Sequence, residues 1–122
     1  IAHLEKTSYR EKLVDVLIVG VHWGDEYQGS ANNKQRAHAR ELIDLGADII
    51  AGHHPHWVQD TETINGKKVY YSLGNFIFDQ MWSEETRKGL AVTLEFDGTN
   101  IVSEKLTNIY INKIGQPDIV NR

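Results

Sequence analysis

The sequence predicts a mixed α/β fold in which a strand-helix-strand unit is followed by β-hairpins. Two short apolar runs, at 14–21 and 48–51, lie on either side of a segment with helical periodicity at 32–45. An Asn65-Gly66 pair then separates two runs with strand-like composition. Apolar runs around a helical segment are typical of α/β folds, and Asn-Gly between strand-like runs is typical of a hairpin.

The length and composition indicate an ordinary globular domain. The 122 residues fit one domain, which we divide into a strand-helix-strand part at 1–57 and a β-hairpin part at 58–122. An apolar fraction of 40% and a charged fraction of 25% exclude a disordered chain. A net charge of −4 with scattered Lys and Arg argues against a nucleic-acid partner. The absence of cysteine excludes disulfides and thiolate ligands.

The first predicted elements are a lead-in and a strand. Residues 3–12 are polar and are expected to form the last turns of a helix or an ordered lead-in. Residues 14–21 are almost all apolar or β-branched, with Asp15 and Gly20 as the interruptions. Such a run predicts a strand that is buried on both faces of an α/β sheet.

The next element is a helix with recognisable ends. Asn32 is the expected N-cap, the helix runs through Leu45, and Gly46 follows where a left-handed residue is needed. His38 lies off the apolar face and is expected to be a solvated helix residue. The residues of the apolar face are Ala39, Leu42, Ile43 and Gly46.

The run 48–51 completes a strand-helix-strand unit of about 38 residues, which is the span of a βαβ motif. The two strands are therefore expected to be parallel, with a right-handed crossover. His22 follows the first strand, and residues 53–56 follow the second. Since open α/β sheets place ligands at the carboxyl edge of their strands, both histidine segments are expected at one site.

The second half predicts two hairpins. Runs at 58–64 and 67–73 flank Asn65-Gly66, whose two residues suit a turn with positive φ. Residues 90–96 alternate apolar and polar side chains, and a turn at 97–100 leads into a strand at 101–111. Between the hairpins, residues 81–88 are polar and are expected to form an excursion or a short helix.

The segment Gly52-His53-His54-Pro55-His56 contains half of the six histidines. Neutral imidazole is the commonest metal ligand in proteins. Pro55 disfavours the α region for His54, so an extended backbone would project His54 and His56 to one side. His53 would then point away and suit a contact with a ligand side chain or with substrate. These residues could also be ordinary turn histidines, but their spacing and the presence of His22 favour a metal site.

Three other polar residues are candidates for the same site. Asp25 and Glu26 follow His22 closely and could orient a ligand or act as general acid or base, with Glu26 preferred. The alternative is that both are solvated loop carboxylates. Asn75 could donate a hydrogen bond to a phosphate or carboxylate oxygen, or the pair Gly74-Asn75 could be a tight-turn element.

Four motifs carry a family resemblance. They are Val21-His22-Trp23-Gly24-Asp25-Glu26-Tyr27, Gly46-Ala47-Asp48, Gly52-His53-His54-Pro55-His56 and Tyr71-Ser72-Leu73-Gly74-Asn75-Phe76-Ile77-Phe78-Asp79. In this order and spacing they resemble the C-terminal half of the bacterial CapA family. These are poly-γ-glutamate capsule synthesis proteins related to calcineurin-like metallophosphoesterases. The resemblance covers roughly residues 13–80.

The resemblance implies a partial αββα metallophosphoesterase-like sandwich, with the hairpins of the second half in its second sheet. It also implies that His22, His54 and His56 hold a divalent ion such as Mn²⁺, Fe²⁺ or Zn²⁺. The Asp-x-His, Gly-Asp and Gly-Asn-His-Glu or related motifs that the superfamily carries upstream of these four are absent. We therefore expect a truncated domain with an incomplete site, inactive alone, and an edge strand exposed where the missing N-terminal half would pair.

Two functions follow from the resemblance. The first is metal-dependent hydrolysis of a phosphoester or related anionic bond, with Glu26, His53 and Asn75 as catalytic residues. The second is a non-catalytic accessory subunit that binds an anionic polymer or the capsule synthase complex. The resemblance further suggests a membrane-anchored parent protein that faces outward from the cell.

Overall fold

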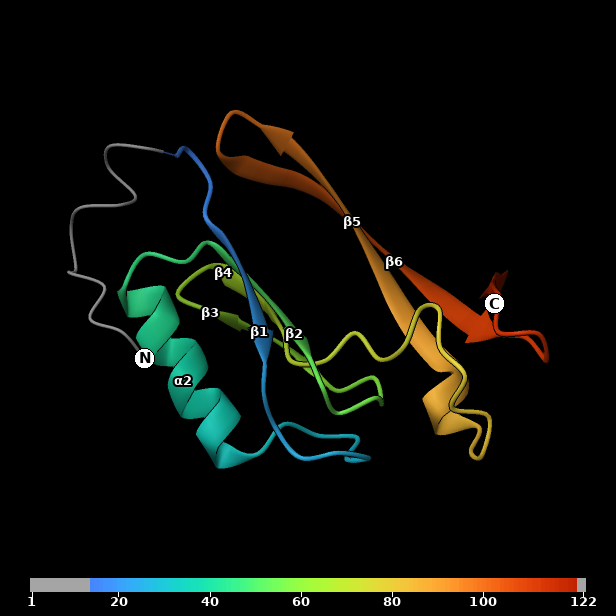
Figure 1. Cartoon of the computed structure of the whole chain (residues 1–122). Coiled ribbons are helices and arrows are strands. Elements are labelled where there is room, and N and C mark those ends of the chain that lie inside the picture. Colours follow the sequence, from blue (N-terminus) through green and yellow to red (C-terminus); the bar gives the residue numbers. More distant parts are fainter. Residues whose placement is uncertain (1–13, 121–122) are drawn as a thin grey trace.

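A computed structural model describes residues 14–120, so the expectation for residues 3–12 lies outside the described part of the chain. The described residues form a mixed α/β structure with two sheets and one α-helix (Figure 1), which confirms the predicted class. The elements are β1 (Ile18–His22), α2 (Asn33–Asp44), β2 (Ile49–His53), β3 (Thr61–Ile64), β4 (Lys67–Tyr70), η1 (Glu85–Arg87), β5 (Lys88–Asp97), β6 (Asn100–Ile111) and β7 (Pro117–Val120). Among residues 14–120, no helix has the length and apolar character needed to cross a membrane.

The helix α2 begins and ends where its capping residues predict. Asn32 accepts a hydrogen bond from the backbone of Gln35, and the Gln35 side chain accepts one from the backbone of Asn32. This reciprocal pair satisfies two backbone donors of the first turn. Gly46 follows with φ of 111°, in the left-handed region that glycine tolerates best. The buried face of the helix packs on the first sheet through Ala39, Ile43, Ile50, Val69 and Tyr71.

The strand-helix-strand unit has the predicted parallel pairing. Strands β1 and β2 are parallel neighbours, and their register places His22 beside His53. Both strands therefore end at the same edge of the sheet (Figure 1). The inference that brought the two histidine segments together is confirmed.

Strand β1 is not buried on both faces, which corrects the sequence prediction. The strand order is β1-β2-β4-β3, so β1 forms one edge of the described sheet. Val19 and Val21 face the helix side and pack against the core, whereas Ile18 is 58% exposed on the other face. The apolar composition of β1 is typical of a central strand, but composition alone does not indicate where a strand lies in the sheet.

The first hairpin extends the first sheet. Strands β3 and β4 pair around Asn65 and Gly66, which have φ of 49° and 76°, as the turn type requires. Strand β4 also pairs in parallel with β2. The expectation that both hairpins build the second sheet is therefore wrong for this one. Because β4 pairs in parallel with β2, the hairpin β3–β4 lies beside the strand-helix-strand unit.

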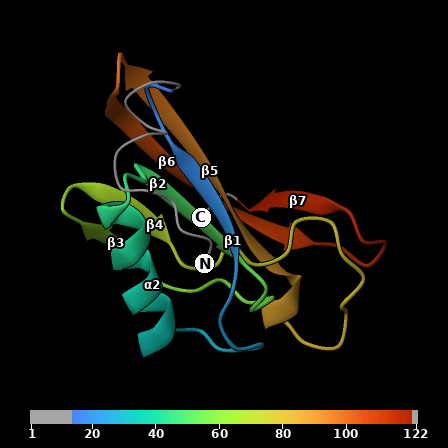
Figure 2. The same ribbon diagram turned by 60° about the vertical axis from the view of Figure 1, so that its left-hand side comes forward.

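The second sheet consists of the long hairpin β5–β6 and the short strand β7, which Figure 2 shows beside β6. The sequence predicts the hairpin but gives no indication of β7. The polar excursion before β5 contains the short helix η1. The two sheets are joined by Glu104 on β6, which accepts hydrogen bonds from Tyr70 at 2.7 Å and from Lys68 at 3.0 Å.

The helix α2 is tied to β3 by a charged network. Arg36 donates to Asp60 and to Glu62, and the Tyr71 hydroxyl donates to Glu62 at 2.6 Å. The hydrogen bonds from Tyr71 and then from Arg36 lower the pKa of Glu62 despite the opposing effect of burial. A carboxyl group whose folded pKa is lowered stabilises the fold above its unfolded pKa, near 4.5.

The Glu62 network predicts a specific dependence of stability on pH. Its stabilisation is fully present above pH 4.5 and is lost as the pH falls through the lower folded pKa. The variant Glu62→Gln should therefore lose less stability between pH 5 and pH 3 than the native protein does. Urea unfolding midpoints at several pH values measure this difference. Equal losses in the two proteins would show that Glu62 does not contribute to acid sensitivity.

Candidate metal centre

The candidate site lies where β1 and β2 end, between the two loops that follow them. The backbone N–H of Trp23 donates to the carbonyl of His53 at 3.0 Å, and that of Tyr27 donates to the carbonyl of Pro55 at 2.8 Å. These two hydrogen bonds hold the loop after β1 against the loop after β2. Side chains from both loops can therefore reach a common point.

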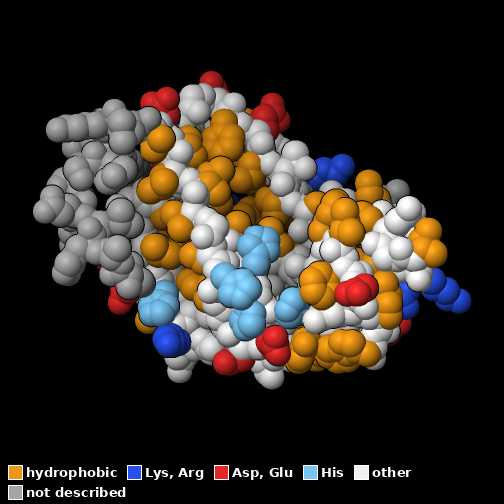
Figure 3. All heavy atoms as spheres, viewed as in Figure 1, with side chains coloured by type: hydrophobic (Ala, Val, Ile, Leu, Met, Phe, Trp, Pro, Cys, Tyr) orange, Lys and Arg blue, Asp and Glu red, His pale blue; other side chains and the backbone are white. Residues whose placement is uncertain are grey.

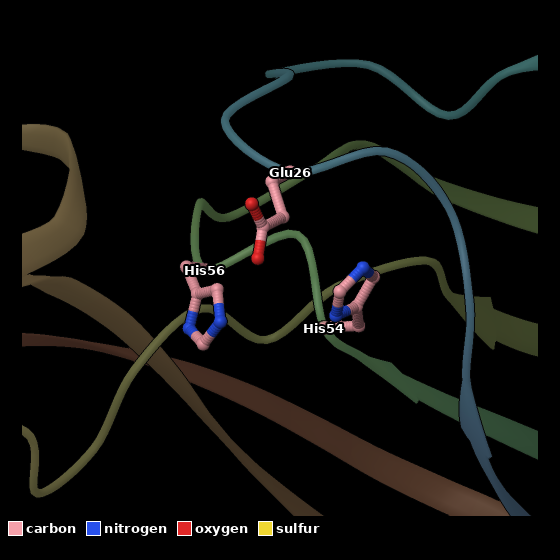
Figure 4. Close-up of side chains that lie close together, drawn as sticks. All are labelled: Glu26, His54 and His56. Carbon is pink, nitrogen blue, oxygen red and sulfur yellow. The ribbon is translucent and has the colours of Figure 1, made fainter.

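Three side chains of this region converge. Glu26, His54 and His56 each offer one ligand atom, and these atoms all lie within 4.8 Å of one another. Figure 4 shows the Glu26 carboxylate directed toward the space between the two imidazole rings. Nitrogen and oxygen ligands bind transition metals at about 2.0–2.2 Å, which places neighbouring ligand atoms about 3–4 Å apart. The separations of the three groups are close to this spacing, and their donor atoms are of the kinds that such ions bind, so these residues fit a metal ion.

His22 and His53 lie beside this group of three. The His22 ring lies 4.4 Å from that of His54, measured between centroids, but His22 is not one of the three converging ligands. His53 is not one of the three either, although it lines the same cavity as His22, His54 and His56. Figure 3 shows histidine side chains gathered on this face, with hydrophobic side chains on either side.

The two histidines of the pair converge through a bent backbone and not through an extended one. His54 has φ of 103° and His56 has φ of 60°, whereas the Pro55 argument predicted extended conformations. Positive φ is uncommon for residues other than glycine and is found where the surroundings impose it. Here the carbonyls on both sides of His54 accept hydrogen bonds from the neighbouring loop. The prediction of convergence holds, but its geometric reason is wrong.

Asn75 contacts the site in a different way from the one predicted. It is 7% exposed, and its Oδ1 lies 2.9 Å from Nδ1 of His56. Its amide nitrogen donates to the carbonyl of Thr86 at 2.8 Å. Both ends of the amide therefore have partners within the protein. Asn75 touches a candidate ligand instead of projecting a free donor toward a substrate.

Asp25, the other loop carboxylate, has a structural partner. Its Oδ2 accepts a hydrogen bond of 2.8 Å from the side chain of Asn32, the N-cap residue of α2. Among residues 14–120 the adjacent Glu26 has no such partner, and it is directed into the site. The preference for Glu26 over Asp25 thus agrees with where the two carboxylates lie.

Aromatic and aliphatic residues surround the histidines. Tyr27 stacks on His56 with ring centroids 6.1 Å apart, and Phe78 lies 5.3 Å from the same ring. Phe76 and Ile77 line the cavity and are 54% and 71% exposed. No Lys or Arg of the described residues lines this cavity. Attraction for an anion would therefore have to come from the histidines or from an ion that they bind.

The loop carrying Glu26 depends on a buried residue that sequence reasoning missed. Gln59 is 4% exposed, and its side-chain nitrogen donates to the carbonyls of Gln28 and Ser30, each at 3.1 Å. Its oxygen accepts a hydrogen bond from the buried Gln35 at 2.8 Å. A single Gln next to a strand carries no sequence signal for such a role. The contact becomes visible only when the fold brings residue 59 beneath the loop.

Loss of this anchor should be measurable. In Gln59→Ala the two loop carbonyls and Gln35 lose their partner, which we expect to lower the free energy of unfolding by about 2 kcal/mol. Urea denaturation measures this change. The matched control is Gln28→Ala in the same loop, where the exposed side chain is removed but the backbone carbonyl remains. Equal small effects in both variants would contradict the anchoring role.

Comparisons with known proteins locate relatives over the same segment. A family model described as bacterial capsule synthesis protein PGA_cap matches residues 2–80, which include Glu26, His54, His56 and Asn75. The chain is 50% identical to the PGA biosynthesis protein CapA of Bacillus subtilis (strain 168) over 76 residues, covering 62% of the chain and 20% of the relative. It is 41% identical to the capsule biosynthesis protein CapA of Bacillus anthracis over 96 residues, covering 78% of the chain and 23% of the relative.

A more distant relative has a different description. A probable polyglutamine synthesis accessory protein of Mycobacterium tuberculosis (strain CDC 1551 / Oshkosh) is 34% identical over 65 residues, covering 53% of the chain and 17% of the relative. The chain thus spans about a fifth of the length of each of these three relatives.

Proposed function

Because the chain belongs to the PGA_cap family of bacterial capsule synthesis proteins, we propose that it acts in the synthesis of a poly-γ-glutamate capsule and contributes a metal-binding site there. The observation that carries the metal site is the convergence of Glu26, His54 and His56 within 4.8 Å. The names of the Bacillus relatives support the capsule role.

We assign Glu26, His54 and His56 as the residues that hold a divalent ion such as Mn²⁺, Fe²⁺ or Zn²⁺. A site of two imidazoles and one carboxylate leaves positions free for water or substrate. Such an ion lowers the pKa of a bound water and stabilises charge on substrate oxygens. Glu26 is thus a ligand in this proposal, in place of the general acid or base suggested by its sequence position.

His22 and His53 have supporting roles in the proposal. His22 packs against the His54 ring and restricts its orientation. His53 lines the cavity, where its imidazole can contact an anionic substrate. The proposed substrate is a molecule with a phosphoester or a related anionic bond. Because no Lys or Arg lines the cavity in the described part of the chain, such a substrate would depend on the bound ion for charge neutralisation.

An accessory role without catalysis is the second candidate. It is favoured by the printed name of the mycobacterial relative, which describes a synthesis accessory protein. The exposed Phe76 and Ile77 at the cavity are also suited to contact a polymer or a protein of the synthase complex. In this case the site would bind its ion without turnover.

The two candidates differ in a simple assay. A purified longer form of the protein, which includes the N-terminal half of the domain, is loaded with Mn²⁺, and hydrolysis of bis-p-nitrophenyl phosphate and release of fragments from poly-γ-glutamate are measured. The hydrolase role predicts turnover that chelation removes and that His54→Ala abolishes. Metal binding without turnover of either substrate would favour the accessory role. Absence of metal binding would contradict the proposal as a whole.

We also propose that the two sheets are part of an αββα metallophosphoesterase-like sandwich. The helix α2 covers one face of the first sheet, and the second sheet contacts that sheet through Glu104. Strand β1 is the outer strand of the described sheet, with an exposed face at Ile18, and is suited to pair with a further segment of the parent protein. A membrane-anchored, outward-facing parent remains part of the same proposal.

A further inference from the structure

We infer that Asn75 is a positioning residue that fixes the tautomer of His56, so that Nε2 and not Nδ1 is the atom presented to a metal. The inference deepens the proposed function and rests on it for the role of His56 as a ligand. Its geometric basis is independent of any bound ion. It lies in the hydrogen bonds that surround the Asn75 side chain.

The orientation of the Asn75 amide follows from its partners. A backbone carbonyl oxygen can only accept a hydrogen bond, so the Asn75 atom that lies 2.8 Å from the Thr86 carbonyl must be the amide nitrogen. The same nitrogen lies 3.3 Å from Oε1 of Gln80. The amide oxygen is therefore the atom that lies 2.9 Å from Nδ1 of His56.

The tautomer of His56 follows in turn. An amide oxygen also can only accept, so Nδ1 of His56 must carry the hydrogen. In the neutral ring, Nε2 is then left with its lone pair. This is the form required for coordination through Nε2. A partner on the other ring nitrogen is the usual way in which proteins orient a ligating histidine.

The Asn75 side chain is held rigidly enough to impose this choice. Thr86, whose carbonyl orients the amide, is fully buried, and its hydroxyl donates to the carbonyl of Gln80 at 2.7 Å. The backbone of Asn75 is fixed as well, since its N–H donates to the carbonyl of Lys88 at 3.3 Å. A Cβ placed on Gly89 would lie 2.0 Å from the Asn75 carbonyl oxygen. Glycine at position 89 thus allows β5 to approach Asn75 closely.

Nitrogen-15 NMR of the metal-free protein, labelled at histidine and held at a pH where the rings are neutral, tests the inference directly. The His56 signals, identified by their loss in His56→Gln, should show a protonated Nδ1 and an unprotonated Nε2. In Asn75→Ala the ring should shift toward the other tautomer. Asn75→Asp should retain the native tautomer, because a carboxylate also accepts from Nδ1–H.

Metal binding supplies the second readout. Asn75→Ala should weaken Mn²⁺ binding by about 10–100-fold, as loss of a partner to a ligating histidine typically does. The matched control is Asn100→Ala, an exposed asparagine at the turn end of the β5–β6 hairpin that does not line the cavity. An Nε2–H tautomer of His56 in the native protein would overturn the inference, even if metal binds. A native protein with the inferred tautomer that binds no metal would instead refute the proposed function alone.

Discussion

Gly52→Ala is expected to lower the free energy of unfolding by about 3 kcal/mol, because the added methyl group has no space. A Cβ at this position would lie 2.0 Å from the carbonyl oxygen of Tyr71 and 2.5 Å from Nε1 of Trp23. Those two atoms are joined by a hydrogen bond of 2.8 Å that would have to break or lengthen. The neighbouring atoms belong to backbone and to a packed indole, so relief requires a shift of β2 or of the chain at Tyr71.

The matched control is Gly20→Ala on the adjacent strand β1. A Cβ at Gly20 meets nothing within 4 Å, and the residue lies in the same parallel pair as Gly52. Its effect on unfolding in urea should stay within about 0.5 kcal/mol. If the two variants were equally stable, the close packing of β2 against Tyr71 and Trp23 would be wrong.

The second large effect is expected on Mn²⁺ affinity when a proposed ligand is removed. Glu26→Gln is expected to weaken Mn²⁺ binding by more than about 100-fold. Loss of a residue that only hydrogen-bonds a ligand already lowers metal affinity by about 10–100-fold. The neutral amide cannot replace the charge that a carboxylate contributes to a cation. Isothermal titration calorimetry of the purified protein measures the affinity.

A neighbouring carboxylate provides the control for this experiment. Asp25→Asn changes the charge by the same amount one residue away. Asp25 accepts a hydrogen bond from the side chain of Asn32, however, and is not among the converging ligands. Its effect on Mn²⁺ affinity should be within a few-fold. Equal losses in both variants would show that Glu26 acts through general electrostatic attraction and not as a ligand.

Local signals predicted most of the first sheet and its helix. The ends of α2 follow from Asn32 and Gly46, and the turn of the first hairpin follows from Asn65 and Gly66, because each residue acts on backbone within a few positions. The shared edge of β1 and β2 follows from the short connection between them. These rules were enough to bring His22 and the histidine segment together.

Features that depend on distant contacts were not predictable in this way. The positive φ of His54 and His56 is imposed by the loop after β1, and it overrides the local preference set by Pro55. The membership of β3–β4 in the first sheet depends on pairing with β2. The contact of Asn75 with His56 joins residues 19 positions apart, and Asn75 is held by hydrogen bonds to Thr86 of η1 and Lys88 of β5. No local pattern in the sequence carries these relationships.

The most direct test of the metal centre is a crystal of the purified protein grown with Zn²⁺, with diffraction recorded on both sides of the zinc absorption edge. The proposal predicts one anomalous peak between Glu26, His54 and His56, at about 2.0–2.2 Å from one atom of each. A zinc peak bound elsewhere, or a structure in which these three side chains surround no zinc, would contradict it.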